Sequence, residues 1–524
     1  MQPSALLPDD RTPLSVPELA VLVAGVASMG LEILAGRLVA PSFGSSIYTW
    51  GSIIGVFLTA LSMGYWYGGR RAAASASTLR LGVILAQSAL FVAFLLAAGD
   101  SVLQVADALP IPSRYAPVLP IAVLFGPPVF LLGFVSPYAA ELSRATSTGS
   151  ASGRVYAIGT VGSIVGSFGT TFVLVPAFSV TVVALLFGAL LVVSAAAIVV
   201  VTAPRTVEVA RVSAVALLVV GAFVFGGSGV ARGGTTVYET QTPYQQLEVV
   251  DDGGVRTLYL DGMPQSATYV DGRQGYVFDY SRYLHVPMLV QDDVDRVLFV
   301  GGGGFTAPQR FVAEYPNVTV DVVEIDPVVI ETAKRYFGLE ESERLHVYRG
   351  DGREFLETTT RTYDLIVLDA YRADKVPFHL TTVEFMTLAS DRLDEDGMLV
   401  ANVISAASGP GSGFFRAEYA TMGEAFPHVY AFPTSETPFL QNIEVVASKR
   451  ELSRSLLERR AETRDVGVPL ETAVADVMAP GSVPTDDVPV LRDEKAPVSE
   501  LLDAQLGRRY VITHNGTTVT AASG

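Results

Sequence analysis

Residues 296–308 read RVLFVGGGGFTAP and set the architecture that we expect for the C-terminal half of this chain. The apolar residues before the glycines predict a buried strand. The four glycines, Gly301 to Gly304, permit a tight turn and bring the backbone close to a ligand. Pro308 suits the first turn of a helix. The stretch therefore predicts the opening strand, turn and helix of a Rossmann-like α/β domain.

Three later strands of this half end in acidic residues. The segments VDVVEID, HVYRGD and YDLIVLD bring Glu324, Asp351 and Asp369 to their strand ends. In an open parallel sheet the carboxyl ends of the strands lie at one edge, where ligands bind. Glu324 lies about 20 residues beyond the glycines, where an acidic side chain can bind both ribose hydroxyls. We therefore expect a nucleoside site at this edge.

The same residues allow two other interpretations. A glycine-rich strand exit is often only a tight turn, and an aspartate at a strand end is often a helix cap. Dinucleotide binding is also open, although the GxGxxG pattern is incomplete because Thr306 occupies its last glycine position. The order and spacing of all four strand ends favour a binding site over a purely structural sheet.

The composition predicts two parts in different solvents. Of 524 residues, 50% are hydrophobic and only 17% are charged, which is too apolar for a purely soluble protein. The net charge of −17 must therefore lie mostly on a soluble part. Lysine occurs at only four positions, and this acidic, lysine-poor balance is typical of adaptation to high salt or of cationic substrates. It excludes the basic surface that nucleic-acid binding needs.

The residue types also limit the chemistry. The sequence contains no cysteine, so it excludes disulfides, thiolate nucleophiles and cysteine-bound zinc. The five histidines lie far apart, without the paired spacing of a metal site. We expect no metal and no prosthetic group.

Seven apolar stretches before residue 230 are long enough, or nearly so, to cross a bilayer. They are residues 17–36, 48–68, 80–98, 117–137, 154–176, 179–202 and 210–227. Lipid is therefore an expected partner, in a multi-pass protein of the cell membrane. The loop arginines favour a cytoplasmic N-terminus. Seven crossings would then place the soluble domain outside the cell. We therefore expect that the number of spans is miscounted at Gly159–Gly169 and that the soluble domain is cytoplasmic.

The expected organisation is a multi-span α-helical membrane domain, then a small β module, then the Rossmann-like domain of the class I methyltransferase type. Short strands in VYET, QQLEVV and RTLYLDG predict the β module. The boundaries are a tail at residues 1–16, the helical domain at 17–230, the β module at 235–290, the Rossmann-like domain at 291–505 and a polar tail at 506–524.

A family resemblance rests on seven segments within residues 238–405. They are TPYQQLEVV, LYLDGMPQS, YLHVP, VLFVGGGG, VVEIDP, GDGREFL and YDLIVLDAY. In this order they resemble the signature of the spermidine and spermine synthases, with a weaker echo in LRDEKAPVSELL at residues 491–502. The apolar half, with LEILAGRLVAPSFGSSIYTWGSIIG from residue 31, resembles the membrane-fused branch of that family.

The resemblance implies an aminopropyltransferase that uses decarboxylated S-adenosylmethionine as co-substrate and a small-molecule amine as acceptor. Asp369 would be the catalytic carboxylate that orients the attacking amine and accepts its proton. The implied binding residues are Glu324 for the ribose, Asp351 and Gly352 for the adenine, Gly301, Gly302 and Gly303 for the sulfonium region, and Gln245 and Gln265 at the border of the nucleoside and amine sites. Tyr371 and Asp374 are predicted to contact the acceptor. The resemblance also allows a homo-oligomer.

Two departures from the family pattern affect the amine side of the site. The family's glycine loop reads GGGDGG, and Gly304 replaces the acid that contacts the transferred aminopropyl nitrogen. The family's DSSDPxGPA becomes DAYRADKVPFHL, so Arg372 replaces its second acid. Methyl transfer from S-adenosylmethionine to another acceptor is therefore one alternative function. A membrane transporter or sensor with a nucleoside-binding domain is another.

Overall fold

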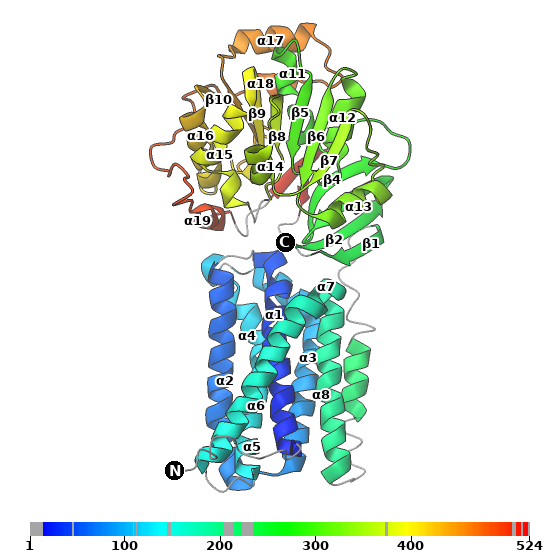
Figure 1. Ribbon diagram of the computed structural model, residues 1–524, viewed down its shortest axis with the longest axis vertical. Coiled ribbons are helices and arrows are strands. Elements are labelled where there is room, and N and C mark those ends of the chain that lie inside the picture. The colour runs from blue at the N-terminus through cyan, green and yellow to red at the C-terminus, as the bar shows by residue number, and fades with distance from the viewer. Residues whose placement is uncertain are drawn as a thin grey trace, which may run out of the picture. The chain divides into compact units, whose positions relative to one another are not determined.

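The computed structural model describes residues 14–43, 47–107, 109, 111, 113–143, 148–202, 213–222, 234–242, 244–372, 376–505, 510–514 and 517–521. It divides into two compact units, a helical unit that ends at Ala231 and an α/β unit from Arg232 onward. Figure 1 shows the helices of the first unit and the sheets of the second.

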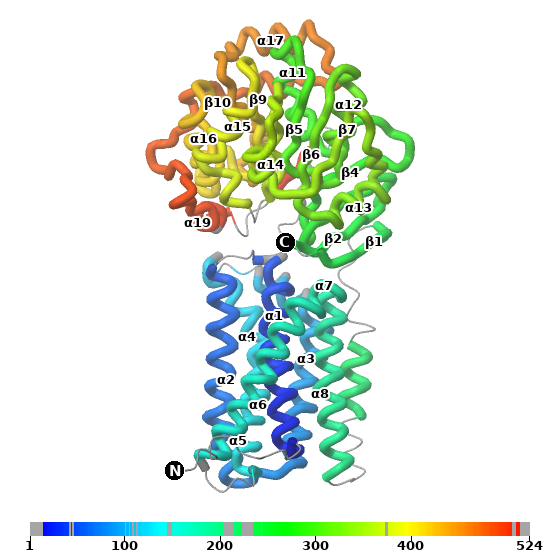
Figure 2. The backbone as a smooth tube through the Cα atoms, in the orientation of Figure 1, coloured from blue at the N-terminus to red at the C-terminus, as the bar shows by residue number. Residues whose placement is uncertain are grey.

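The helical unit is built from long apolar helices that lie side by side (Figure 2). Its elements are α1 Val16–Phe43, α2 Ile47–Ser75, α3 Thr78–Asp107, η1 Ser113–Tyr115, α4 Val118–Leu124, α5 Gly126–Leu142, α6 Thr148–Gly169, the π-helical turn η2 Thr170–Leu174, α7 Val175–Ala177, α8 Val180–Thr202 and a helix at Ser213–Ala222. Among the described residues, five helices are long and apolar enough to cross a membrane, and α4 with α5, bent by 54°, would make a sixth.

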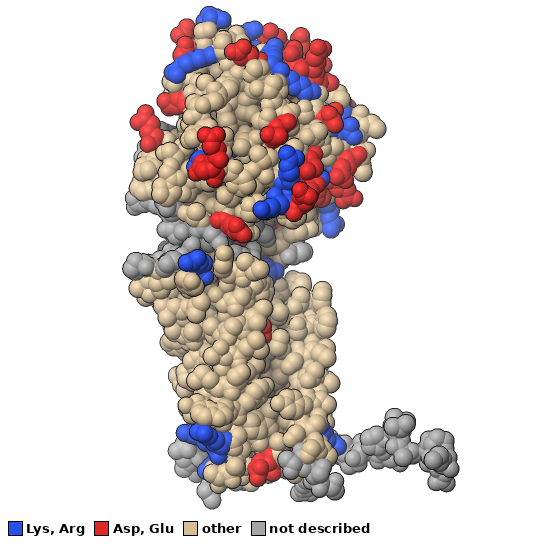
Figure 3. Space-filling view, turned by 90° about the vertical axis from the view of Figure 1, so that its left-hand side faces the viewer, with Lys and Arg blue, Asp and Glu red and all other residues tan. Residues whose placement is uncertain are grey.

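The structure revises two details of the expected spans. Gly159–Gly169 is not a break, because it lies within α6 and the segment Gly149–Ala177 passes as one span. The seventh expected stretch, 210–227, is described only as the short helix Ser213–Ala222. On the face seen in Figure 3, charged side chains cover the α/β unit, whereas on the helical unit they lie almost only at its ends. This distribution matches the two solvents that the composition predicts.

The α/β unit begins with a four-stranded antiparallel sheet in the order β1-β2-β3-β4. Its strands are β1 Thr235–Gln241, β2 Gln246–Asp252, β3 Val255–Leu260 and β4 Met263–Tyr269. Asp252, Gly253 and Gly254 turn the chain between β2 and β3, and both glycines have positive φ. Two short helices, α10 Tyr280–Tyr283 and α11 Val286–Val290, lead from this sheet to the next.

A seven-stranded sheet in the order β10-β11-β9-β8-β5-β6-β7 forms the centre of the unit. Its strands are β5 Arg296–Val300, β6 Thr319–Glu324, β7 Leu345–Arg349, β8 Tyr363–Leu368, β9 Leu393–Ser405, β10 His428–Pro433 and β11 Gln441–Ser448. Strands β5 to β9 are parallel, whereas β11 runs antiparallel to both of its neighbours. The chain goes from β5 to β6 on one side and later to β8 on the other, so the strand order reverses at β5.

Helices cover both faces of this sheet. They are α12 Thr306–Glu314, α13 Pro327–Tyr336, α14 Gly352–Thr358, η3 Phe378–Leu380, α15 Val383–Asp391, α16 Gly413–Ala425, α17 Arg454–Thr463, α18 Glu471–Ala475 and α19 Val498–Asp503. Alternate residues of β5 serve the two cores: Val297 and Phe299 pack with α12, and Leu298 and Val300 pack with α14 and α15. Near-continuous apolar strands are what a sheet covered on both faces requires.

The C-terminal residues 506–524, which we expected to form a polar tail, are described in part as a hairpin. Strand β12, Tyr510–His514, pairs with β13, Thr517–Ala521. Tyr510 and Ile512 are buried in a small apolar cluster of the α/β unit, and Val511 is buried as well. The expectation was wrong for this stretch because three consecutive apolar residues find a surface to pack on.

Candidate active site

The glycine loop after β5 packs so tightly against its neighbours that there is no room for side chains on it. Gly301 has φ +96°, and a Cβ atom there would lie 2.4 Å from the carbonyl oxygen of Asp369. A Cβ atom at Gly304 would lie 2.7 Å from Cβ of Ser266, and the Gly304 amide donates to Ser266 Oγ at 2.9 Å. The loop is thus held between the end of β8 and strand β4. Gly304, where the family pattern has an acid, is the point at which the first sheet meets this loop.

Glu324 lies at the end of β6 and is turned toward the glycine loop. Its Oε2 accepts from the Gly302 amide at 2.9 Å, and its Oε1 accepts from the Asp326 amide at 2.9 Å. Burial raises the pKa of this carboxyl, and the two amide hydrogen bonds act in the opposite direction. Glu324 therefore links the ends of two neighbouring strands, at the position where we expect ribose to bind.

Asp351 caps helix α14 at the next strand end. Its Oδ1 accepts from the amides of Arg353 and Glu354 at 2.9 and 3.1 Å. Its Oδ2 lies 2.9 Å from Nε2 of His379. Burial opposes ionisation, but the amide of Glu354 and the imidazole of His379 outweigh it and hold the pKa of Asp351 below its usual range. The two amides therefore use one carboxylate oxygen of Asp351, and the imidazole of His379 contacts the other.

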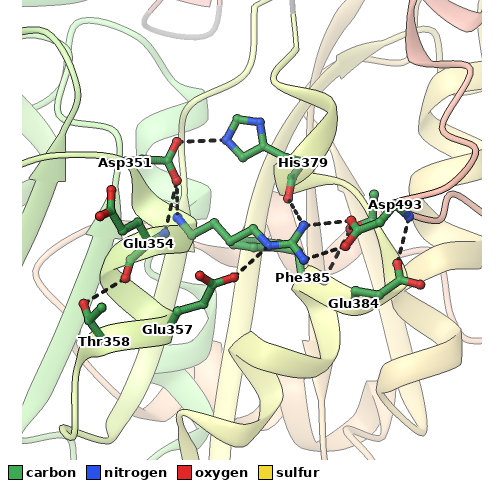
Figure 4. A network of polar contacts seen from close by, with 10 residues as sticks. Asp351, Glu354, Glu357, Thr358, His379, Glu384, Phe385 and Asp493 are labelled. Atoms are coloured by element: carbon green, nitrogen blue, oxygen red, sulfur yellow. Dashed lines mark hydrogen bonds and ion pairs between the residues drawn. The ribbon is translucent and has the colours of Figure 1, made fainter.

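A polar network fixes the segment that carries His379 (Figure 4). Arg353 on α14 donates to both oxygens of Asp493, at 2.7 and 2.6 Å, and to the carbonyl oxygen of His379 at 3.2 Å. Asp493 also accepts from Thr382 Oγ1 at 2.7 Å, and its amide donates to Glu384. The network brings Asp493, from the stretch 491–502, next to the segment that carries His379.

Asp369 follows β8 at the reversal of the strand order, directly beside Gly301. Its Oδ1 accepts from Asn402 Nδ2 on β9 at 2.8 Å. Burial raises the pKa of this carboxyl, and the Asn402 hydrogen bond partly offsets the rise. Asn402 Oδ1 accepts in turn from Asn442, and Asn442 Oδ1 accepts from the hydroxyl of Tyr510, each at 2.8 Å. A chain of three neutral side chains therefore orients Asp369.

Arg372 occupies the acceptor side of the site. Its Nη1 donates to Asp261 Oδ2 at 2.8 Å and to Gln245 Oε1 at 3.0 Å. Asp261 follows β3 with φ +46°, and its other oxygen accepts from the Gln246 amide at 2.8 Å. The guanidinium that replaces the family's second acid is therefore already neutralised, and it ties the segment after β8 to the first sheet.

The remaining predicted residues have mixed outcomes. Tyr371 does not join the site: its hydroxyl donates to Glu418 at 2.8 Å and to the Leu380 carbonyl, in the core on the opposite face of the sheet from Asn402. A Cβ atom at Gly352 would lie 2.3 Å from Val300, so this glycine allows α14 to pack on β5. The backbone carbonyl of Gln265 accepts from Tyr280. Asp374 lies outside the described residues.

The sequence interpretation missed several residues of this edge. They are Ser266, Asn402, Asn442, Glu444, Asp493 and Tyr510. Only Glu444 carried a local signal, as an acidic residue within the apolar strand IEVVAS. Within the described ranges, no three His, Asp or Glu side chains gather as metal ligands would.

Comparison with known proteins finds similarity to the polyamine aminopropyltransferases. The sequence model of the spermine/spermidine synthase domain matches residues 278–433. A polyamine aminopropyltransferase of Vibrio vulnificus is 31% identical over 206 residues, which are 38% of this chain and 67% of that protein. A probable polyamine aminopropyl transferase of Bifidobacterium longum is 28% identical over 295 residues, 53% of this chain and 64% of that protein.

Among solved structures, a spermidine synthase of Thermotoga maritima aligns with a TM-score of 0.37 at 22% identity, and the alignment covers 46% of this chain and 83% of that one. This likeness adds nothing to the sequence match. The sequence similarity itself extends over about two thirds of the Vibrio vulnificus protein. On that similarity, this chain belongs to the spermine/spermidine synthase family.

Proposed function

We propose that the α/β unit transfers an aminopropyl group from decarboxylated S-adenosylmethionine to an amine acceptor. The observation that carries this proposal is the position of Asp369, beside Gly301 and on the same sheet edge as Glu324 and Asp351. The nucleoside would lie along the ends of β5, β6 and β7, with its sulfonium group over the glycine loop. Asp369 would then face the carbon atom that is attacked.

The chemistry requires a carboxylate at this position. A protonated amine has no lone pair, so Asp369 must first hold the ammonium group and then accept one proton from it. The new bond forms between nitrogen and the carbon next to sulfur. The carbon–sulfur bond breaks, its electron pair stays on sulfur, and methylthioadenosine leaves. Because burial raises the pKa of Asp369, this carboxylate is a better proton acceptor than an exposed aspartate.

A product assay tests this proposal. The full-length chain in detergent receives decarboxylated S-adenosylmethionine or S-adenosylmethionine, each with a mixture of diamines and polyamines, over a range of salt concentrations. We expect methylthioadenosine from the first donor and a loss of roughly 100- to 10,000-fold in rate for Asp369→Asn. Methyl transfer would instead give S-adenosylhomocysteine from the second donor. Binding of either nucleoside without any product would favour a sensor.

We also propose that the helical unit lies in the cell membrane with six crossings and a cytoplasmic α/β unit. Six crossings place Arg70, Arg71, Arg80 and Arg154 next to loops on the same side as the N-terminus, as the positive-inside rule requires. The chain has no cysteine, so single cysteines report topology directly. In intact cells a membrane-impermeant maleimide should label Ser179→Cys and not Ser77→Cys. The reverse pattern would contradict this orientation.

A further inference from the structure

Strand β11 carries a buried glutamate, Glu444, whose carboxylate oxygens accept no hydrogen bond from the described residues. Glu444 has no exposed surface, and neither carboxylate oxygen has a hydrogen-bond partner among the described residues. In the register between β9 and β11, Glu444 lies opposite Asn402, the residue that holds Asp369. Paired residues project from the same face of a sheet. Glu444 is therefore on the catalytic face, one strand beyond Asn402.

The surroundings of Glu444 are neutral or acidic. Three tyrosines lie close enough to Glu444 to interact with its charge: Tyr280 and Tyr283 from α10 and Tyr510 from β12. Burial raises the pKa of each of these phenols. Tyr280 and Tyr510 also feel the charge of Asp369. The pKa of Glu444 is raised well above its ordinary value, first by burial and then by the charge of Asp369. A second carboxyl group is thus placed near Asp369, and no cation among the described residues contributes to the pKa of Glu444.

Such a carboxyl group costs free energy unless a donor or a cation completes it. Buried polar atoms without partners are rare in folded proteins, and each requires an explanation such as a bound ligand. A purely structural acid would be expected to resemble Glu418, another glutamate of this unit whose side chain has no exposed surface. Glu418 accepts a hydrogen bond from Tyr371 at 2.8 Å on the opposite face of the sheet. Glu444 has no such partner.

We infer that Glu444 is a specificity residue that binds the remote ammonium group of the acceptor, while Asp369 holds the attacking nitrogen. This inference rests on the proposed function. Two strand spacings of about 4.8 Å separate the backbone of Asp369 from that of Glu444, a gap that two side chains and a short aliphatic chain can bridge. The acceptor class is therefore a linear amine with at least two ammonium groups, rather than a monoamine.

Binding of the acceptor should also release a proton from Glu444. In the free protein, burial raises the pKa of the Glu444 carboxyl well above its ordinary value and so favours its protonated form. When an ammonium group binds beside it, the ionised form is favoured and the proton leaves to solvent. A diamine should thus release a proton on binding that a monoamine of the same length does not release.

The test uses the full-length chain with saturating decarboxylated S-adenosylmethionine, 1,4-diaminobutane and butylamine as matched probes. Glu444→Gln keeps the size of the side chain and removes its charge. We expect the KM for the diamine to rise at least tenfold, with the KM for butylamine and the affinity for the donor unchanged. Glu418→Gln, which removes a buried glutamate on the other face, should leave all three values unchanged. A diamine KM within twofold of the unaltered protein in Glu444→Gln would overturn the inference.

Calorimetry in the presence of methylthioadenosine separates this inference from the proposed function. Diamine titrations in two buffers of different ionisation enthalpy count the protons released. We expect release from the unaltered protein and none from Glu444→Gln. If the protein binds the diamine in this way but forms no methylthioadenosine from any amine, the proposed function fails and the subsite stands. If it turns over diamines without proton release on binding, the subsite fails and the function stands.

Discussion

The nucleoside side and the acceptor side of the candidate active site are built in different ways. On the nucleoside side, the glycine loop, Glu324 and Asp351 each follow directly from a parallel strand, and backbone amides fix both carboxylates. On the acceptor side, the contacts of Arg372 with Asp261 and of Asn402 with Asp369 join side chains from different sheets or strands. The first construction tolerates little change of backbone. The second allows the substrate to change through single side chains.

The largest effect is expected on the nucleoside side, from Gly301→Ala. The added Cβ atom would meet the Asp369 carbonyl at 2.4 Å, and φ of +96° is unfavourable for alanine. We expect kcat/KM to fall at least about 100-fold, and the free energy of unfolding to fall by about 1–3 kcal/mol. Methylthioadenosine affinity, steady-state kinetics and urea unfolding measure these changes.

Gly423→Ala is the matched control, because Gly423 lies in helix α16 with open space where the Cβ atom would be. It should keep full activity and gain up to roughly 1 kcal/mol of stability. Activity of Gly301→Ala within threefold of the unaltered protein would mean that the backbone of the nucleoside side is more adaptable than the comparison implies.

An intermediate effect is expected on the acceptor side, from separating Arg372 and Asp261. Each single variant, Arg372→Met or Asp261→Asn, breaks a largely buried ion pair. We expect kcat/KM for the amine to fall about tenfold in each and to recover in the double variant, which corresponds to a coupling energy of about 2–3 kcal/mol. Donor affinity should fall by less than the amine kcat/KM, because only the contact of Arg372 with Gln245 reaches the border of the nucleoside site.

The exposed pair Arg273 and Asp271 on the same first sheet is the control for this cycle. Its double variant should leave the kinetics unchanged, since exposed ion pairs contribute little. Additive losses in Arg372→Met and Asp261→Asn would show that the two residues act separately and would weaken the division into two sides.

The difference between the sides also explains what the sequence could predict. Each strand exit on the nucleoside side carries a local pattern of apolar strand, then glycine or acid, so topology alone brings Glu324, Asp351 and Asp369 together. The acceptor side depends on the antiparallel register of β9 and β11, which pairs Asn402 with Glu444. No local pattern encodes a pairing between residues so far apart in the chain.

The sequence also suggested a site residue, Tyr371, that the structure places elsewhere. It lies two residues after Asp369, but β8 ends at Leu368, so the alternation of faces no longer applies to it. Its hydroxyl finds Glu418 on α16, and its ring packs against Phe414. Proximity in sequence to a catalytic residue therefore did not predict a place in the site. Likewise, Tyr510 reaches Asn442 because the C-terminal strand β12 packs on the α/β unit. The polar composition of this stretch gave no indication that it would pack there.

A smaller effect is expected in the pH profile, through Asn402. Burial raises the pKa of Asp369, so its ionised form, which accepts the proton, is populated only above the usual range of a carboxyl. The kcat/KM for the amine should therefore rise with pH along an acid limb set by Asp369. Asn402→Leu removes the hydrogen bond that stabilises the carboxylate, so this limb should move to higher pH. A limb that does not move, or moves to lower pH, would contradict the assignment of Asp369 as the base.

The smallest effect is expected at the contact between His379 and Asp351. The imidazole holds Oδ2 of Asp351 at 2.9 Å, but the amides of Arg353 and Glu354 still orient the carboxylate without it. His379→Leu should therefore weaken donor binding by about threefold or less, as the loss of a half-exposed pair implies. His428→Leu, on β10, should have no effect. A loss of 30-fold or more would show that a side chain, and not the backbone of α14, positions Asp351, and the nucleoside side would then resemble the acceptor side in its construction.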